Sequence, residues 1–270
     1  MTVREFGQQH TKHLLFFPGS CEPWQEFAYA AKELAARYHV LLVTPDGHDP
    51  DERTDFISVE KTVDDTARWL KEHRIDRLDA LYGLSFGGGM VVCFLTTQDI
   101  PADRVIIDAG TAPYRFPKWI CKLICVRDYV MFKIGRASLA AMESAFPPER
   151  FARNRKNAKA EYREIQRYLR TFSNRTVWNI FWSANNYAVP KVAPPILSRI
   201  QFWVGSEEWK GRYRDLKWTK AYLPQIEVVT IPRMMHGEYV MMHSKAFAAQ
   251  ALTFFDGAET EENGKENWEQ

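Results

Sequence analysis

The chain has 270 residues, of which 46% are hydrophobic and 14% aromatic, so it can bury a sizeable core as one large domain or two small ones. No apolar run approaches the roughly 20 residues of a membrane span, and the first residues lack the apolar core of a signal peptide. We therefore expect a soluble, cytoplasmic protein. The formal net charge of +2 conceals an asymmetry, because residues 111–197 carry 16 Lys and Arg against five Asp and Glu.

No residue pattern indicates a cofactor site. The four cysteines show no metal-ligand spacing with histidines and are expected to be free thiols in a reducing compartment. The sequence contains no glycine-rich phosphate loop, and its basic segment lacks the aromatic stacking platform typical of nucleic-acid binding. We expect no metal, no cofactor and no nucleic-acid partner.

Short apolar runs alternate with segments whose apolar residues recur at helical spacing. The first nine residues are weakly patterned and are expected to add one edge strand. Strands are then predicted at residues 12–17, 40–43, 78–82, 104–108, 199–205 and 226–231. Helices are predicted at 24–37 and 62–72, directly after residue 85, several times within 111–195, and at 242–255. Buried strands that alternate with helices are typical of an α/β protein with a parallel sheet covered on both faces.

The segment Gly83-Leu84-Ser85-Phe86-Gly87 joins the third of these strands to an apolar helix. A serine between two glycines at this point is typical of a nucleophile elbow, in which the serine occupies a strained turn. Side chains two residues before and after the serine would collide with each other or with the adjoining strand. We therefore predict Ser85 to be an exposed nucleophile, although the same pattern also occurs by chance in ordinary loops.

The whole chain resembles the α/β-hydrolase superfamily, because a helical insertion follows the strand after the elbow helix and the strand pattern then resumes. The resemblance implies an eight-stranded, mostly parallel twisted sheet, a helical cap, and a Ser, acid, His triad in that chain order. It divides the chain into a core (1–110 and 198–257), a cap or lid (111–197) and an acidic, disordered tail (258–270). About eleven residues precede the first clear strand, so the family's first two strands are expected to be shortened or merged.

His236 is the expected general base, because a serine hydroxyl needs a base within hydrogen-bond reach. It lies between the last predicted strand and the final helix, where the family has its histidine. His243, within that helix, is the alternative base, and capping of the helix by His236 is the non-catalytic alternative. The five other histidines precede Ser85, which is the wrong chain order.

Glu208 is the expected acid of the triad, which accepts a hydrogen bond from the histidine and stabilises the imidazolium. In many members of the family an aspartate follows the seventh strand as Gly-x-x-Asp, and Glu208 holds that position after Gly205. Three other carboxylates remain open as alternatives at this point, namely Glu207, Asp215 and Asp108.

The oxyanion hole is expected to consist of backbone N–H groups. One donor is Phe86, directly after the nucleophile, and the other is Ser20 or Cys21, in the loop that follows the first clear strand. An ordinary Pro-Gly turn is the alternative interpretation of that loop. Cys21 is expected to line the pocket rather than to act as a nucleophile.

The cap is expected to shape the substrate pocket. Trp178, Phe181 and Trp182 recur at helical spacing, and their shared face could roof a pocket for an apolar acyl or aryl group. The basic run from Arg150 to Arg175 is interpreted as a solvated helix face, with an anionic ligand, an acidic partner or an anionic membrane as alternatives.

These residues together predict a serine hydrolase that cleaves a small carboxylic ester, thioester or lactone through an acyl-enzyme. A serine at the elbow disfavours the epoxide hydrolase and dehalogenase branches, which need a carboxylate nucleophile. The alternatives are a carbon–carbon bond hydrolase with the same triad and a non-catalytic ligand-binding protein. The oligomeric state and the natural substrate do not follow from the sequence.

Overall fold

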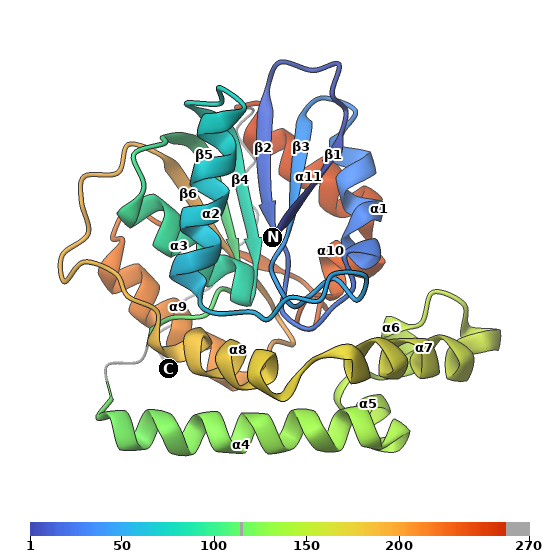
Figure 1. Cartoon of the computed structure of the whole chain (residues 1–270). Coiled ribbons are helices and arrows are strands. Elements are labelled where there is room, and N and C mark those ends of the chain that lie inside the picture. Colours follow the sequence, from blue (N-terminus) through green and yellow to red (C-terminus); the bar gives the residue numbers. More distant parts are fainter. Residues whose placement is uncertain (114–115, 258–270) are drawn as a thin grey trace.

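The computed structural model describes residues 1–113 and 116–257, and its central element is a seven-stranded sheet (Figure 1). The strand order is β1-β3-β2-β4-β5-β6-β7, in which β1 runs antiparallel to β3 and all other neighbours are parallel. The strands are β1 (Thr2–Phe6), β2 (His13–Phe17), β3 (His39–Thr44), β4 (Leu78–Leu84), β5 (Ala102–Asp108), β6 (Arg199–Gly205) and β7 (Glu227–Ile231).

Helices cover both faces of this sheet because its strands are apolar on both sides. In β2, Leu15 and Phe17 belong to one core cluster while Leu14 and Phe16 belong to the other, as the two-residue period of a strand requires. The first cluster also contains residues of α2 (Val59–Glu72), α3 (Phe86–Thr97) and α9 (Lys210–Tyr222). The second contains residues of α1 (Trp24–Leu34), α10 (Glu238–Met242) and α11 (Ser244–Phe255).

In the described part of the chain, the regular elements between β5 and β6 are all helices. These helices are α4 (Lys118–Ala137), α5 (Leu139–Ala145), α6 (Pro148–Phe151), the short 3-10 turn η1 (Arg155–Asn157), α7 (Ala158–Thr171) and α8 (Asn174–Asn186). Figure 1 shows them grouped at the carboxyl ends of the parallel strands, with α4 outermost. Helices therefore stand where the cap is expected. We call α4–α8, with η1, the cap helices or the cap, and the division of the chain into separate units stays a prediction.

The structure confirms most of the predicted elements and changes several. The sheet has seven strands instead of the family's eight, because β1 alone precedes β2. The predicted final helix, 242–255, is present as α11 with its start two residues later. The short helix α10 before it was not predicted, and the His243 backbone leaves the helical conformation between the two helices. Helix α9 was not predicted, because its alternating basic and aromatic residues show no clear apolar face. The predicted acidic tail lies outside the described residues.

Candidate active site

Ser85 occupies a sharp turn between β4 and α3. Its φ of 52° lies in the left-handed region, which a residue with a side chain adopts only under constraint. A Cβ atom on Gly83 would lie 2.4 Å from the carbonyl oxygen of Gly87, and one on Gly87 would lie 2.3 Å from that of Phe17. The steric reason expected for both glycines is therefore confirmed.

Backbone hydrogen bonds fix this turn to the end of β5. The N–H of Ser85 donates to the carbonyl oxygen of Asp108 at 2.7 Å. The carbonyl oxygen of Ser85 accepts from the N–H groups of Gly89 and Thr111, at 3.2 and 2.9 Å. Phe86 begins α3, so its N–H has no acceptor one turn earlier within the helix. The turn thus holds the serine rigidly at the carboxyl edge of the sheet.

His236 and Glu208 are hydrogen-bonded to each other in the loops that follow β7 and β6. The Nδ1 atom of His236 lies 2.9 Å from Oε2 of Glu208, and both side chains are buried. The other carboxylate oxygen, Oε1, accepts from the N–H of Trp209 at 2.8 Å. A carboxylate acceptor at Nδ1 favours the tautomer that carries its proton there, which leaves Nε2 free to accept a proton.

The two loops that carry this pair are joined along their backbones. The N–H of Ser206 donates to Ile231, and the N–H of Glu207 donates to Met234 at 3.1 Å. Gly205 is required at this junction, because a Cβ atom there would lie 2.1 Å from the carbonyl oxygen of Met234. The acid loop and the histidine loop therefore form one rigid unit.

The indole of Trp209 stacks on the imidazole of His236, with ring centroids 4.7 Å apart and planes inclined by 22°. Sequence reasoning did not identify this residue. The signal that could have found it was its position, directly after the acid, as a tryptophan in a loop. Stacking on one face and the bond to Glu208 at the edge together fix the orientation of the imidazole.

None of the alternative acids contacts His236. Asp108 accepts a hydrogen bond of 2.7 Å from the Tyr82 hydroxyl instead, and burial with the nearby charge of Glu208 raises its pKa to about 7. Asp215 pairs with Arg212 at 2.9 Å, and Glu207 pairs with Arg150. The structure thus brings Glu208, and none of the three other carboxylates, to the histidine.

His243, the alternative base, stands apart from this pair. It is 45% exposed, and its Nε2 atom lies 3.8 Å from Glu238. It does not line the cavity that contains Ser85 and His236.

A cavity of about 560 Å³ lies between the sheet edge and the cap helices. Ser85, Phe86 and His236 line its floor together with Ser20 and Cys21, so the residues predicted as nucleophile, base and oxyanion donors share one space. The walls are mainly apolar and come from α4, α5, α7 and α8. Burial raises the pKa of the Cys21 thiol, which keeps it protonated and agrees with a lining role.

The structure brings one of the three predicted pocket aromatics to the cavity and places the other two elsewhere. Phe181 lines the cavity, whereas Trp178 and Trp182 do not. Each helical residue advances about 100° around the axis, and the lining positions of α8 are Ile180, Phe181, Ala184 and Asn185. Residues 178 and 182 therefore lie to the side of this face. Trp178 packs instead against Tyr129 of α4, with ring centroids 6.1 Å apart.

Two basic residues of the cap are fixed to the core, which departs from the expected solvated face. The guanidinium of Arg150 pairs with Glu207 and Glu238, and it donates to the carbonyl oxygen of Arg233 at 2.6 Å. Arg153 pairs with Glu26 at 2.8 Å and donates to the carbonyl oxygen of Met241. Arg150 thereby connects the cap to both loops that carry the histidine and its acid.

Glu22 is a further cavity residue that sequence reasoning missed. It follows Cys21 and lines the cavity, and its Oε2 atom is buried without a hydrogen-bond partner among the described residues. Burial, with the nearby Glu26 as a smaller cause, raises the pKa of this carboxyl to about 8. Its position directly after the Pro-Gly loop was the available signal.

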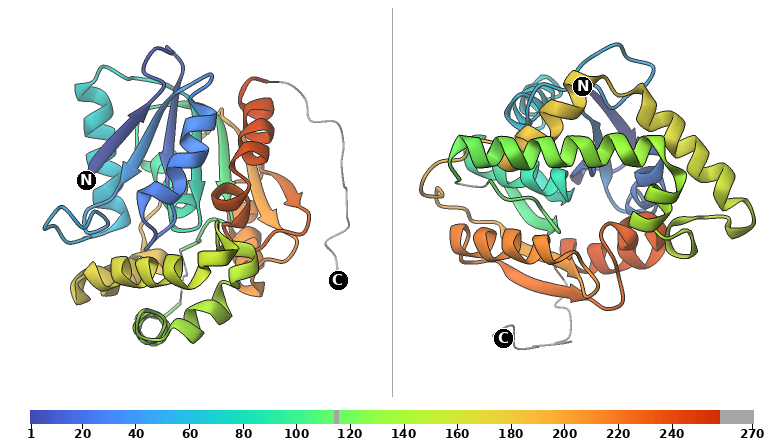
Figure 2. Two further views of the ribbon diagram at one scale, coloured as in Figure 1. Left: turned by 90° about the vertical axis from the view of Figure 1, so that its right-hand side faces the viewer. Right: turned by 90° about the horizontal axis from the view of Figure 1, so that it is seen from below.

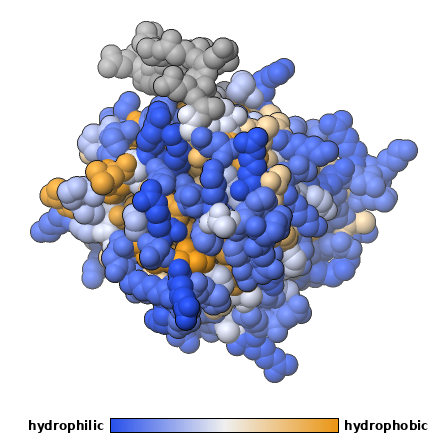
Figure 3. Space-filling view, turned by 90° about the horizontal axis from the view of Figure 1, so that it is seen from above, coloured by the Kyte–Doolittle hydropathy of each residue, from blue (hydrophilic) through white to orange (hydrophobic). Residues whose placement is uncertain are grey.

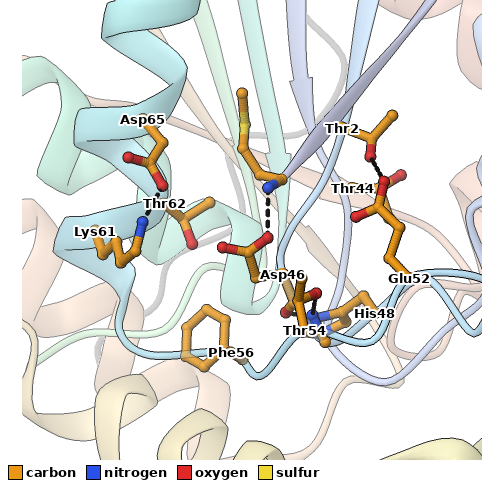
Figure 4. Close-up of polar contacts among 12 residues, drawn as sticks. Thr2, Thr44, Asp46, His48, Glu52, Thr54, Phe56, Lys61, Thr62 and Asp65 are labelled. Atoms are coloured by element: carbon orange, nitrogen blue, oxygen red, sulfur yellow. Dashed lines mark hydrogen bonds and ion pairs between the residues drawn. The ribbon is translucent and has the colours of Figure 1, made fainter.

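The loop after β3 is tied to the cap rather than to the cavity. Figure 4 shows Asp46, His48 and Phe56 along it. The His48 ring lies edge-on to the rings of Phe56 and Phe172, and burial lowers the pKa of His48 to about 4. The backbone carbonyl oxygen of His48 accepts a hydrogen bond from the Tyr168 hydroxyl. Among the described residues, no group of three or more His, Cys, Asp or Glu side chains is arranged to hold a metal ion.

Comparisons with known proteins agree with this arrangement. The chain matches the Alpha/beta hydrolase family over residues 14–250. A search of curated protein sequences found no match.

Similar solved structures include MenH from S. aureus, with a TM-score of 0.70 and 14% identity, covering 94% of this chain and 97% of that one. They also include a carboxylesterase of Nitrososphaera gargenis, with a TM-score of 0.68 and 14% identity, covering 94% of this chain and 93% of that one. A third is an esterase of Thermogutta terrifontis, with a TM-score of 0.68 and 16% identity, covering 92% of this chain and 90% of that one. These structures share the fold, and the match to the family over residues 14–250 shows that the chain belongs to the alpha/beta hydrolase family.

Proposed function

We propose that the protein is a serine hydrolase that cleaves a small carboxylic ester, with Ser85 as nucleophile, His236 as general base and Glu208 as the acid that orients it. The observation that carries the proposal is the 2.9 Å hydrogen bond between His236 and Glu208, on the cavity that Ser85 lines. Family membership supports hydrolase activity. Esters are the substrates named for two of the similar structures, which supports this choice of substrate class.

Acylation starts when the Oγ atom of Ser85 attacks the ester carbonyl carbon while Nε2 of His236 takes its proton. Glu208 stabilises the imidazolium that forms. The negative charge on the carbonyl oxygen is stabilised by the N–H of Phe86 and by that of Ser20 or Cys21. Collapse of this intermediate breaks the ester C–O bond, and His236 returns the proton to the departing alcohol.

Deacylation repeats these steps with water. His236 takes a proton from the water molecule as its oxygen attacks the acyl carbon, and the proton then passes to Oγ of Ser85 as the carboxylic acid leaves. The apolar walls of the cavity favour an apolar acyl or aryl group and limit entry of bulk water.

The four cysteines are free, which supports a reducing compartment, and we place the enzyme in the cytoplasm.

A fluorophosphonate probe tests this proposal directly, because it phosphonylates activated serines. We expect stoichiometric labelling of the wild-type protein and no labelling of Ser85→Ala. Ser20→Ala is the matched control, since it changes a serine of the same cavity that has no role as nucleophile, and it is expected to label normally. Equal labelling of Ser85→Ala and wild type, or no labelling of either, contradicts the proposal.

A further inference from the structure

Helix α4 is apolar on the side that faces the protein and again on the side that faces solvent. Toward the protein, Cys121 and Cys125 are buried, and Phe132 packs against Phe172 and Phe181. Most of the large hydrophobic side chains that are exposed in the described part of the chain belong to this helix or just precede it. Seven of the twelve do so, namely Phe116, Trp119, Leu123, Val126, Val130, Met131 and Ile134.

Five of these exposed residues form a stripe along the helix. Trp119, Leu123, Val126, Val130 and Ile134 are separated by three or four positions and therefore share one face. We call these five residues the outer stripe. Figure 2 shows, in its right-hand view, α4 crossing the lower face of the molecule in front of the other elements. Soluble proteins rarely expose a continuous apolar surface of this kind unless it binds something.

Positive charges border the outer stripe. Lys118 and Lys122 are exposed along one edge, and Arg127 is exposed along the other. The only acid in α4, Asp128, already pairs with Arg127 at 2.7 Å. An apolar stripe bordered by Lys and Arg suits a helix that lies in the surface of an anionic bilayer. The opposite face of the molecule differs, since Figure 3 shows mainly hydrophilic residues there.

The outer stripe is continuous with the active-site cavity. Ile134 belongs to the stripe and also lines the cavity, and the exposed Met131 beside it does the same. A substrate that moves from the outer surface of α4 past these two residues toward Ser85 therefore stays in contact with apolar side chains. This path connects a surface on which a lipid could rest with the nucleophile.

We propose that the outer stripe of α4 docks on an anionic lipid surface, and that the substrate is a lipid-like ester taken up from that surface. The second half of the proposal rests on the proposed function, whereas the docking does not. The predicted contact is peripheral, because no helix of the described chain is both long and apolar enough to cross a bilayer. Docking would insert the stripe among the acyl chains and leave the lysines at the headgroups.

The charges favour lipid over a second copy of this chain. In a twofold pair of α4 helices, Lys118 and Lys122 of each copy would approach the same basic border, and α4 has no unpaired acid to compensate. A protein partner on the stripe would also cover Met131 and Ile134, where the cavity reaches the surface. A lipid surface carries negative charge and at the same time supplies the apolar ester.

Co-sedimentation with vesicles tests the docking. We compare vesicles of phosphatidylcholine alone with vesicles of equal parts phosphatidylcholine and phosphatidylserine. Wild-type protein is expected to bind the anionic vesicles at least tenfold more strongly. The double variant Leu123→Asp, Val130→Asp is expected to lose at least tenfold of this binding, and Lys118→Glu with Lys122→Glu is expected to remove the preference for phosphatidylserine.

The matched control is the double variant Val192→Asp, Leu197→Asp, which places the same charges on exposed apolar residues outside the cap helices. It is expected to bind vesicles like the wild type. None of these substitutions changes a cavity residue, so hydrolysis of soluble p-nitrophenyl acetate is expected to stay unchanged. Hydrolysis of a long-chain ester embedded in anionic vesicles is expected to fall at least tenfold for the stripe variant and also for the lysine variant, but not for the control.

Several results would overturn the docking. Wild-type protein that binds neither kind of vesicle would do so, as would a stripe variant that binds like the wild type. Sedimentation equilibrium of the wild type and of the single variant Leu123→Asp is the further check. A wild-type dimer that this substitution dissociates would show that a second copy of the chain covers the outer stripe. Vesicle binding without hydrolysis of any ester would keep the docking and contradict the proposed function.

Discussion

The sheet edge and the cap form opposite sides of one cavity and are built in different ways. On the sheet side, Ser85, Glu208 and His236 are each fixed by short hydrogen bonds within a rigid backbone. On the cap side, the wall consists of apolar side chains such as Phe132 and Phe181, which bind through shape and surface area. This difference indicates that the core determines the chemistry and that the cap determines which substrates reach it.

The comparison predicts two kinds of variant. Substitutions at the sheet edge should reduce turnover of every ester by a similar factor, because they remove transition-state stabilisation. Substitutions in the cap wall should change the ranking of esters instead. The predictions that follow test this division, beginning with the largest expected effect.

His236→Ala removes the proposed general base, the only histidine among the described residues that line the cavity, and should lower kcat for p-nitrophenyl acetate by roughly 10⁴ to 10⁶. His243→Ala is the matched control and should change it by less than about threefold, because His243 lies outside the cavity. Steady-state kinetics of the two variants measure the difference. Comparable losses in both would move the base to another group.

Glu208→Gln keeps the shape of the acid but removes its charge, so it should lower kcat by on the order of 10² to 10⁴. Asp108→Asn should cost less than about threefold, because this carboxyl contacts Tyr82 and not the histidine. Measured kcat values for the pair decide between the two acids. A larger loss in Asp108→Asn would show that Asp108 is the working acid.

Arg150→Met tests whether the cap also supports the chemistry. The change leaves the buried Glu238 without its cation and frees the histidine loop, so we expect kcat to fall about tenfold for all esters. It should also lower the free energy of unfolding by about 1–3 kcal/mol, measured in urea. Arg163→Met on the exposed face of α7 is the control and should alter neither quantity.

Phe181→Ala enlarges the cavity and should act on substrate choice. We expect kcat/KM to fall about tenfold for a hexanoate or benzoate ester, and by less than about twofold for the acetate. Trp182→Ala removes a neighbouring aromatic residue that does not line the cavity and should leave the ranking unchanged. An equal loss on all esters in Phe181→Ala would contradict the assignment of selectivity to the cap.

The stability of the protein should also depend on pH. Asp108 has a pKa of about 7 in the folded protein, against about 3.9 in the unfolded chain, so folding retains a proton in the interval between them. The free energy of unfolding therefore falls as the pH rises from about 4 to about 7. Asp108→Asn should weaken this decrease without abolishing it, because Glu22 contributes in the same direction. Urea unfolding at pH 5 and pH 8 measures the change, and an unchanged slope would contradict it.

Much of the sheet side was predictable from the sequence. The elbow glycines are required by close contacts within the turn and with the end of β2, and the order of Ser85, Glu208 and His236 was expected from the resemblance to the family. The position of Glu208 after Gly205 favoured it as the acid, but the sequence left three other carboxylates open, because the choice depends on which loop reaches Nδ1 of His236. Trp209 and Glu22 were missed because their roles arise only from neighbours in space.

The cap was less predictable, because an apolar position on a helix does not state which partner it faces. The sequence pattern placed Trp178, Phe181 and Trp182 on one face, but the cavity lies to one side of that face, so Phe181 is the only one of the three that lines it. The basic run gave no sign that Arg150 reaches two acids far along the chain, one in the loop after β6 and one at the start of α10. The second apolar face of α4 appears only when its packing side is known.

The central claim is that Ser85 carries the acyl group, and rapid mixing of the protein with p-nitrophenyl acetate followed by acid quench and mass spectrometry tests it. We predict a burst of p-nitrophenol equal to the enzyme concentration and one acetyl group per chain, on the peptide that contains Ser85. An acetyl group on another residue, or steady turnover with no covalent adduct, would contradict this account.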